Sequence, residues 1–361
     1  MAQIQLHERW SILDQGALAA WLARENQPKF RLGQIRQAVF SPTVSSWADI
    51  TTLPEELRVK AEQESYFLSL TSASTLPSFG GSSTKLVLKT HDDLFLECVI
   101  IFHKERTTLC VSSQVGCPLK CSFCTTGKMG FFRNLTWYEI VDQLRFVNMV
   151  LDKAKLPGVR NIVFMGMGEP LLNYENVMRA IDCMIDPKSG GLAKRHITLS
   201  TSGLISQIKR LIKDKRRLNF ALSLHAPTAE IRAMIMPIEA SNPLPDLMQA
   251  VKEYSDAFDK RIFIEYIMLK GINDHYSHAE QLARLLRGMH VHVNLIAYNS
   301  FQKDDELASS DEPTMRAFQG ILTKYSIPST IRGVHGRDVK AACGQLGFEF
   351  ARKKLQSKKT T

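Results

Sequence analysis

From about residue 107 onward, short runs rich in β-branched and aliphatic residues alternate with helix-length amphipathic segments. This alternation is typical of βαβ units, in which a helix connects two parallel strands of one sheet. The six expected strands are fewer than the eight that close a TIM barrel, so the sequence predicts an α/β protein with an open or partial (β/α)6 barrel. Functional side chains should then follow the carboxyl ends of the strands. The expected strands are 107–112, 161–165, 196–200, 219–224, 261–269 and 291–297.

Three segments with different sequence patterns precede the barrel. In the first, apolar residues recur at helical spacing and predict helices over 14–24, 32–40 and 54–65. Residues 72–84 are rich in Ser, Thr, Gly and Pro, and we interpret them as a linker or turn. Strand-like runs separated by polar turns then predict a short strand meander. The expected parts of the chain are an N-terminal helical accessory domain over 1–75, a meander over 85–106, a barrel over 107–350 and a basic tail over 351–361.

The charge balance indicates a polyanionic partner. Of the 361 residues, 46 are Lys or Arg and 36 are Asp or Glu, which gives a formal net charge of +10. An apolar content of 44% excludes a disordered chain. The first residues lack the apolar core of a signal peptide, and no run of roughly 18 apolar residues could cross a bilayer. We therefore expect a cytoplasmic protein without a membrane segment.

Three of the seven cysteines, Cys117, Cys121 and Cys124, lie in one loop with the spacing C-x3-C-x2-C. Structural zinc usually takes four ligands, often as two separated pairs, and the sequence contains no second pair of that kind. Three thiolates on one loop suit a four-iron cluster whose fourth iron stays open for another ligand. A zinc site completed by a histidine is the alternative interpretation.

This motif, directly after the first barrel strand, resembles that of the radical S-adenosylmethionine (SAM) enzymes, in which the open iron binds SAM. Longer strings narrow the resemblance to the RlmN/Cfr family of radical SAM RNA adenine methyltransferases. The resemblance implies a partial radical SAM barrel, a [4Fe–4S] cluster held by Cys117, Cys121 and Cys124, and a 5′-deoxyadenosyl radical formed from SAM. The strings are 110–117 (CVSSQVGC), 130–136 (GFFRNLT), 165–170 (MGMGEP) and 341–346 (AACGQL).

The same resemblance assigns roles to two further cysteines. It implies that Cys343 takes a methyl group from one SAM, and that the radical from a second SAM removes hydrogen from the S-methyl group. The resulting carbon radical adds to adenine, and Cys110 removes the proton whose loss releases the product. A disulfide between Cys110 and Cys343 would then need reduction before the next cycle. Glu97 matches a family glutamate described as a proton acceptor, although its plain interpretation is a solvent-facing strand residue. Without the family strings, both cysteines would be interpreted as packing residues.

Residues at the ends of the strands could bind the polar groups of SAM. Gly168 allows backbone to approach a ligand closely, and Glu169 offers a carboxylate to an ammonium group. A phosphate loop is the alternative for this turn, but no Gly-Lys-Ser/Thr follows. The resemblance adds hydroxyl, imidazole and amide groups that follow later strands. These further SAM-contacting positions are Ser200, Ser223, Leu224, His225 and Asn299.

Family members act on an adenine of 23S rRNA, and the housekeeping branch also acts on tRNA. That branch methylates C2, and Pro170 matches it, whereas a resistance branch methylates C8. We expect RNA and an electron-donor protein as partners, and a monomer. A radical SAM enzyme with a non-RNA substrate and a zinc-stabilised RNA-binding protein are the alternatives. Basic residues that could contact phosphates are Arg31, Arg36, Lys60, 194–196, 209–210, 213–217, 352–354 and 358–359.

Overall fold

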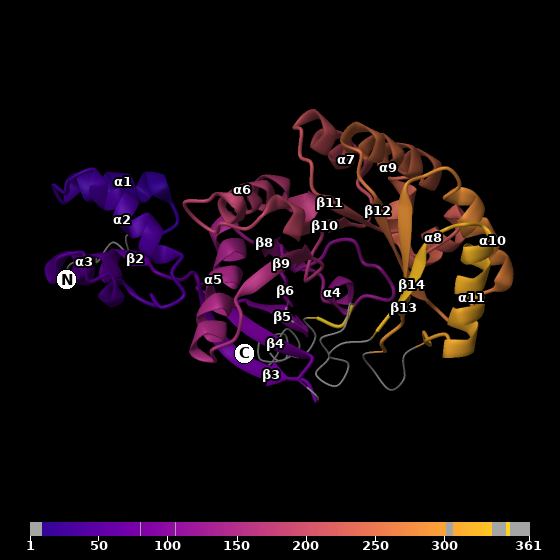
Figure 1. Ribbon diagram of the computed structural model, residues 1–361, viewed down its shortest axis with the longest axis horizontal. Helices are drawn as coiled ribbons and strands as arrows, with labels where there is room; N and C mark the ends of the chain where they lie inside the picture. The colour runs from indigo at the N-terminus through magenta and orange to yellow at the C-terminus, as the bar shows by residue number, and fades with distance from the viewer. Residues whose placement is uncertain (1–8, 80, 105, 301–305, 334–343, 347–361) are drawn as a thin grey trace, which may run out of the picture.

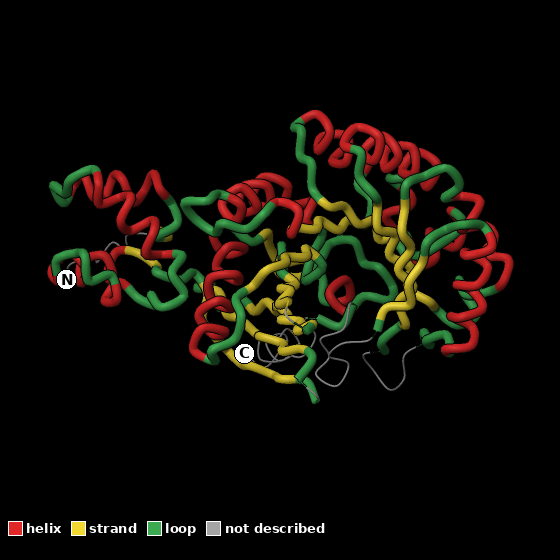
Figure 2. The backbone as a smooth tube through the Cα atoms, viewed as in Figure 1, coloured by secondary structure: helices red, strands yellow, loops and turns green. Residues whose placement is uncertain are grey.

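The computed structural model describes residues 9–79, 81–104, 106–300, 306–333 and 344–346. Within them the chain forms an α/β fold around one ten-stranded sheet, in the order β14-β13-β12-β11-β10-β9-β6-β5-β4-β3. The sheet curves into an open arc, with α4 inside the arc and long helices on its outer side (Figures 1 and 2). No helix in these described ranges is long and apolar enough to cross a membrane.

The N-terminal segment is helical, as the periodicity predicts. Three helices lie beside α5 (Figure 1). Tryptophan rings of this segment pack against one another, and Trp47 is fully buried. Two short strands, β1 and β2, pair in parallel at the base of this segment. The elements are β1 (Trp10–Ser11), α1 (Gln15–Arg24), α2 (Phe30–Val39), the 3-10 helix η1 (Trp47–Asp49), α3 (Glu55–Glu64) and β2 (Ser65–Tyr66).

A buried ion pair on α5 (Trp137–Lys153) fastens this helical segment to the sheet layer. Arg145 and Asp142 have side chains that are 2% and 0% exposed, and they lie 2.5 Å apart. Arg145 also donates to the carbonyls of Val39 and Phe67, while Asp142 accepts from the backbone and hydroxyl of Ser69. A buried charge is tolerated only with such partners, so these contacts fix how the helical segment meets α5.

Four antiparallel-paired strands form one side of the sheet, and the prediction of a linker or turn over 72–84 is wrong for 72–77 and 83–84, which belong to strands. Residues 70–77 form edge strand β3, which pairs only with β4 among the described strands. Its Ser and Thr side chains face solvent along an unpaired edge, so the composition resembles a linker although the backbone is extended. The strands are β3 (Leu70–Pro77), β4 (Ser83–Thr90), β5 (Phe95–His103) and β6 (Arg106–Cys110).

The remaining strands are parallel and follow the predicted βα alternation. Six strand–helix units run from β6 to β13, and a seventh parallel strand, β14, pairs with β13 and was not predicted. The strands are β9 (Val159–Phe164), β10 (Ile197–Thr201), β11 (Asn219–Ser223), β12 (Ile262–Met268), β13 (Val291–Ala297) and β14 (Ser329–Arg332). The helices after α5 are α6 (Tyr174–Ile185), α7 (Ile205–Lys213), α8 (Ala229–Ile235), α9 (Leu244–Phe258), α10 (Tyr276–Leu285) and α11 (Glu312–Lys324), with 3-10 turns η2 (Pro170–Asn173), η3 (Lys194–His196) and η4 (Pro237–Ala240).

A small ribbon and a short helix follow β6 and carry the cysteine loop. They are β7 (Gln114–Gly116), α4 (Thr125–Lys128) and β8 (Phe131–Asn134). A capping box starts α5, since the Thr136 hydroxyl accepts from the Glu139 backbone and the Glu139 carboxylate accepts from the Thr136 backbone. This cap fixes the direction in which the chain leaves the ribbon.

The domain limits at 75, 85, 107 and 351 stay predictions.

Candidate active site

One cavity lies at the carboxyl ends of the parallel strands. Its volume is about 140 Å³, and its wall is built from the cysteine loop and from residues that end β9, β10, β11 and β12. The end of one strand after another contributes to it because all these strands run in the same direction. Of the sequence-predicted residues, the wall includes Cys117, Cys121, Cys124, Gly168, Glu169, Ser200, Ser223 and His225.

Backbone hydrogen bonds hold the cysteine loop in place. The Cys117 N–H donates to the Gly130 carbonyl at 3.0 Å, which closes the loop on itself. A Cβ at Gly116, where φ is +77°, would lie 1.9 Å from that same carbonyl oxygen, so only glycine fits there. At the far side of the loop, the Ser122 N–H donates to the carbonyl of Ile235 on α8 at 3.0 Å. The loop is therefore tied to both the ribbon and the barrel.

The three thiols share a dry environment. Burial raises the pKa of Cys117 to about 12, and it also raises the pKa values of Cys121 and Cys124, whose negative charges would repel one another. Such thiols stay protonated unless a cation compensates for the missing water, and metal binding supplies that cation. Among the described residues, no three metal-binding side chains converge on a single ion position. A four-iron cluster does not require that convergence because each thiolate binds a different iron. The donor set fits such a cluster.

Glu169 is held with its carboxylate in the cavity wall. It is 2% exposed, and its two oxygens accept from the backbone N–H groups of Leu171 at 3.0 Å and Ser202 at 2.8 Å. Burial raises the pKa of Glu169, although these donors favour the ionised form. A bound ammonium group would complete the charge balance that burial leaves open. Gly168, at φ +96°, carries the chain past Gln114, whose Cβ lies only 2.5 Å from the place of a Gly168 Cβ.

His225 is a neutral donor toward the cavity. Its Nδ1 accepts from the Ile267 N–H at 3.1 Å, so the remaining proton lies on Nε2. Burial, with a smaller effect from the nearby Arg232, lowers the pKa of His225 to about 3. The ring packs edge-on against Phe123 of the cysteine loop at 4.8 Å between centroids. Its orientation is thus set by contacts from both sides.

Two of the predicted SAM-contacting residues lie behind the cavity wall. Leu224 is fully buried, and its backbone N–H donates to the Glu265 carbonyl at 3.1 Å. Asn299 is 5% exposed, and its side-chain amide donates to the Ala297 carbonyl at 3.1 Å. Neither side chain is part of the wall, so contact with a ligand would have to come through backbone or through movement.

The strand register brings Glu97 and Cys110 to the same face of the sheet. Val99 pairs with both Lys85 and Cys110, and residues two apart on a strand share a face, so Lys85, Glu97, Val99 and Cys110 all lie on one side. Glu97 is 3% exposed and lies 3.4 Å from the Lys85 ammonium group. The interpretation of Glu97 as a solvent-facing residue is therefore wrong. Cys98, one residue further along β5, faces the opposite side.

Cys343 lies outside the described residues, but its neighbour Gly344 is part of the cavity wall. The Gly344 carbonyl accepts from the Thr125 N–H at 2.7 Å, and the Leu346 carbonyl accepts from the Thr126 hydroxyl at 2.8 Å. Both donors belong to α4, which begins directly after Cys124. The segment that follows Cys343 is therefore docked on the cysteine loop.

Sequence reasoning missed two buried charged residues near the cavity. Glu265 is part of the wall and is held by Asn294 at 2.8 Å and Arg332 at 3.3 Å. Burial raises its pKa. Arg232 of α8 is fully buried behind the wall. A charged residue inside the otherwise apolar run 262–269 was a signal for Glu265, whereas nothing in the local pattern distinguished Arg232.

Several basic residues that were candidates for RNA contacts are engaged in ion pairs within the protein. These pairs lie on the helical segment and on the outer helices α6 and α7, where they reduce the charge available to a phosphate. The pairs join Arg36 to Asp186, Lys60 to Glu25, Arg210 to Glu175 and Arg216 to Asp182.

The open parallel sheet and the three-cysteine cavity at its carboxyl edge define a radical SAM protein. The model of the radical SAM superfamily matches residues 111–286, and the cofactors of this class are a [4Fe–4S] cluster and SAM. A solved structure titled a radical SAM methyltransferase, from Sphaerobacter thermophilus, is similar with a TM-score of 0.90 and 36% identity, over 95% of this chain and all of that one.

Curated relatives narrow the class further. A probable dual-specificity RNA methyltransferase RlmN from Microcystis aeruginosa is 41% identical over 330 residues, which covers 91% of this chain and 95% of the relative. A probable dual-specificity RNA methyltransferase RlmN 2 from Protochlamydia amoebophila is 38% identical over 336 residues, 93% of each chain. This chain belongs to the RlmN family.

Proposed function

We propose that this protein methylates C2 of an adenine in 23S rRNA, and in tRNA, through a methyl group carried by Cys343. The observation that carries this proposal is the position of Gly344, the residue after Cys343, in the same cavity wall as Cys117, Cys121 and Cys124. The relatives' names, dual-specificity RNA methyltransferase, support RNA as the substrate. The chain's net charge of +10 is compatible with that partner.

We assign the cavity residues as follows. Cys117, Cys121 and Cys124 would hold the cluster, whose fourth iron takes SAM. Glu169 would bind the ammonium group of SAM, and the Nε2–H of His225 would donate to an acceptor of the ligand. Gly168, with Ser200 and Ser223, would line the rest of the ligand, and Leu224 and Asn299 would support it from behind. Bound together, the cluster and SAM supply a methyl group and a 5′-deoxyadenosyl radical.

The protein's own residues would then perform two tasks. The Cys343 sulfur accepts a methyl group, and after that methyl carbon has lost a hydrogen atom it forms a bond to the adenine carbon. The Cys110 thiolate would remove the proton from that carbon, and with one electron returned to the cluster the ring would be aromatic again. The Cys110 sulfur would then bond to the Cys343 sulfur, which breaks the bond between the Cys343 sulfur and the transferred carbon. That carbon would take up a proton and become the methyl group, and the Cys110–Cys343 disulfide would be reduced before the next cycle. Glu97, on the same face as Cys110 and beside Lys85, is a second candidate proton acceptor. We also propose an electron-donor protein as partner, and a cytoplasmic monomer.

The decisive experiment uses Cys110→Ala, with Cys98→Ala as a matched control. Both cysteines are buried on neighbouring strands, but they face opposite sides of the sheet. Each variant is purified anaerobically with its cluster, digested with nuclease and protease, and analysed by mass spectrometry. We expect a nucleotide on the Cys343 peptide of Cys110→Ala alone, and the linkage carbon distinguishes C2 from C8.

Two results would contradict the proposal. If Cys343 carries neither methyl nor RNA while the cluster is intact and SAM is cleaved, the chain is a radical SAM enzyme with another substrate. If anaerobically purified protein contains zinc without iron or sulfide, radical chemistry itself is excluded.

A further inference from the structure

Two neighbouring phenylalanines on β8 stand exposed beside the cysteine loop. The Phe131 and Phe132 side chains are 46% and 42% accessible to solvent. In the part of the chain that the structure describes, no other two exposed large apolar residues are adjacent in sequence. Exposed apolar groups that are clustered, instead of scattered singly, indicate a contact surface.

The ribbon that carries these rings is continuous with the cavity wall. Phe131 pairs with Gly116, and the next residue, Cys117, donates its N–H to the Gly130 carbonyl. On the other strand of the ribbon, Gln114 accepts from the Glu169 N–H at 2.8 Å. A bulge opposite Gly116 gives β8 one residue more than β7, an arrangement that re-aims side chains near active sites. The two rings therefore lie on the rim of the site.

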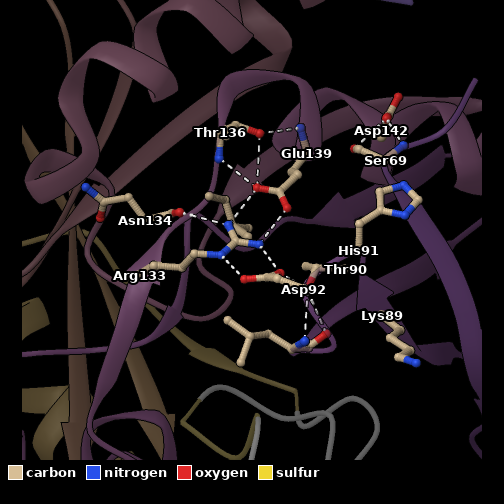
Figure 3. A network of polar contacts seen from close by, with 12 residues as sticks. Ser69, Lys89, Thr90, His91, Asp92, Arg133, Asn134, Thr136, Glu139 and Asp142 are labelled. Atoms are coloured by element: carbon tan, nitrogen blue, oxygen red, sulfur yellow. Dashed lines mark hydrogen bonds and ion pairs between the residues drawn. The ribbon is translucent and has the colours of Figure 1, made fainter. Parts of the chain in front are cut away.

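Arg133 fixes this ribbon in place, as Figure 3 shows. Its guanidinium group bridges two carboxylates, Asp92 at 2.7 and 2.8 Å and Glu139 at 2.8 Å to each oxygen. Asp92 belongs to the turn between β4 and β5, which lies at the carboxyl edge of the sheet because β5 runs antiparallel to β6. With both carboxylates bound, Arg133 serves as a clamp. The backbone that carries the two rings is thus held in place before any partner arrives.

We infer that Phe131 and Phe132 form a stacking platform for unpaired RNA bases next to the target adenine. The inference rests on the proposed function and extends it to how the substrate is held. An adenine carbon can react only after its base has left the helical stack, and aromatic rings restore the stacking that neighbouring bases lose. Lys120 and Lys128, both exposed on the same loop, bring positive charge to this rim, which favours RNA over an apolar peptide.

The test compares aromatic with merely apolar side chains. Double variants with Ala, Leu or Tyr at 131 and 132 are titrated with a synthetic RNA hairpin whose loop carries 2-aminopurine beside an unpaired adenine. Phe79→Ala is the matched control because Phe79 is 94% exposed in the turn after β3, at the opposite edge of the sheet. We expect the Ala and Leu variants to bind about 5- to 140-fold more weakly per lost stack. Tyr and Phe79→Ala should stay within about twofold.

Two further readouts separate stacking from general damage. Iron content and SAM affinity should be unchanged in every variant, and the slope of affinity against salt should match the wild type because no phosphate contact is removed. Wild-type affinity in the Leu variant would overturn the inference in favour of a simple apolar contact. Wild-type affinity in the Ala variant would overturn it altogether. If the wild type neither binds nor methylates RNA, the proposed function fails first, and the platform fails with it.

Discussion

Replacing Arg232 with Met should be among the most damaging single changes behind the cavity. Arg232 is 0% exposed and forms an ion pair with Glu239. It also donates to the carbonyls of Ser202 at 2.6 Å and Asn242 at 3.4 Å. The change leaves one buried carboxylate and two carbonyls without their donor, and removing one member of a buried pair costs about 3–5 kcal/mol. Because the Ser202 N–H binds Glu169, SAM affinity should fall as well.

The magnitude can be checked by urea unfolding followed by far-ultraviolet circular dichroism. A loss of 3–5 kcal/mol lowers the folding equilibrium constant by roughly two to four powers of ten. Adding Glu239→Gln should recover about half of the lost stability. The neutral amide oxygen can still accept from the Leu244 N–H, which lies 2.8 Å from the Glu239 carboxylate in the wild type. Arg316→Met, which breaks an exposed pair with Glu312, is the control and should cost at most about 0.5 kcal/mol. The reasoning is refuted if Arg232→Met costs no more than Arg316→Met, or if the second change recovers nothing.

Three further changes test other parts of the site. Gly168→Ala forces a side chain to φ +96° against Gln114, and equilibrium binding should show SAM affinity reduced about 5- to 140-fold; unchanged affinity would contradict this geometry. Arg133 holds the pKa of Asp92 down at about 2, below its ordinary value of 3.8, so the pair stabilises the fold above pH 3.8 and the benefit fades as pH falls toward 2. Melting temperatures of Asp92→Asn should therefore vary less than those of the wild type across this window, and equal slopes would argue against the clamp. Cys121→Ala should lose most of the bound iron, measured by iron and sulfide analysis, and full retention would exclude Cys121 as a ligand.

Where the sequence pattern was regular, prediction of the fold succeeded. Strand β13 begins and ends at the predicted residues, 291 and 297, and the first helix differs only at its cap, Asp14. The pattern failed at the two outer strands of the sheet. Both β3 and β14 lie at the edges of the sheet among the described strands, and most of their side chains are exposed or half-buried, so neither shows the apolar run of the inner strands.

Prediction of the site also succeeded for local sequence features and failed for contacts between distant segments. The spacing of the cysteines and the strand-end positions of Glu169 and His225 are local features, and the structure brings these residues together in one cavity. The partners that orient them come from far along the chain. Gln114 approaches Glu169, and Ile267 sets the tautomer of His225, through contacts that depend on the curved arrangement of the strands. Periodicity in one segment carries no information on such pairs.

The docking of residues 344–346 on α4 has a consequence for timing. Thr125 and Thr126, at the start of that four-residue helix, hold the segment after Cys343, and the helix itself begins directly after Cys124. The cysteine loop and the segment after Cys343, which we propose carries the methyl group, are thus held by the same short helix. The two steps proposed at Cys343, methyl transfer and then hydrogen abstraction, would therefore depend on the same position of α4. A small rotation of α4 would disturb both.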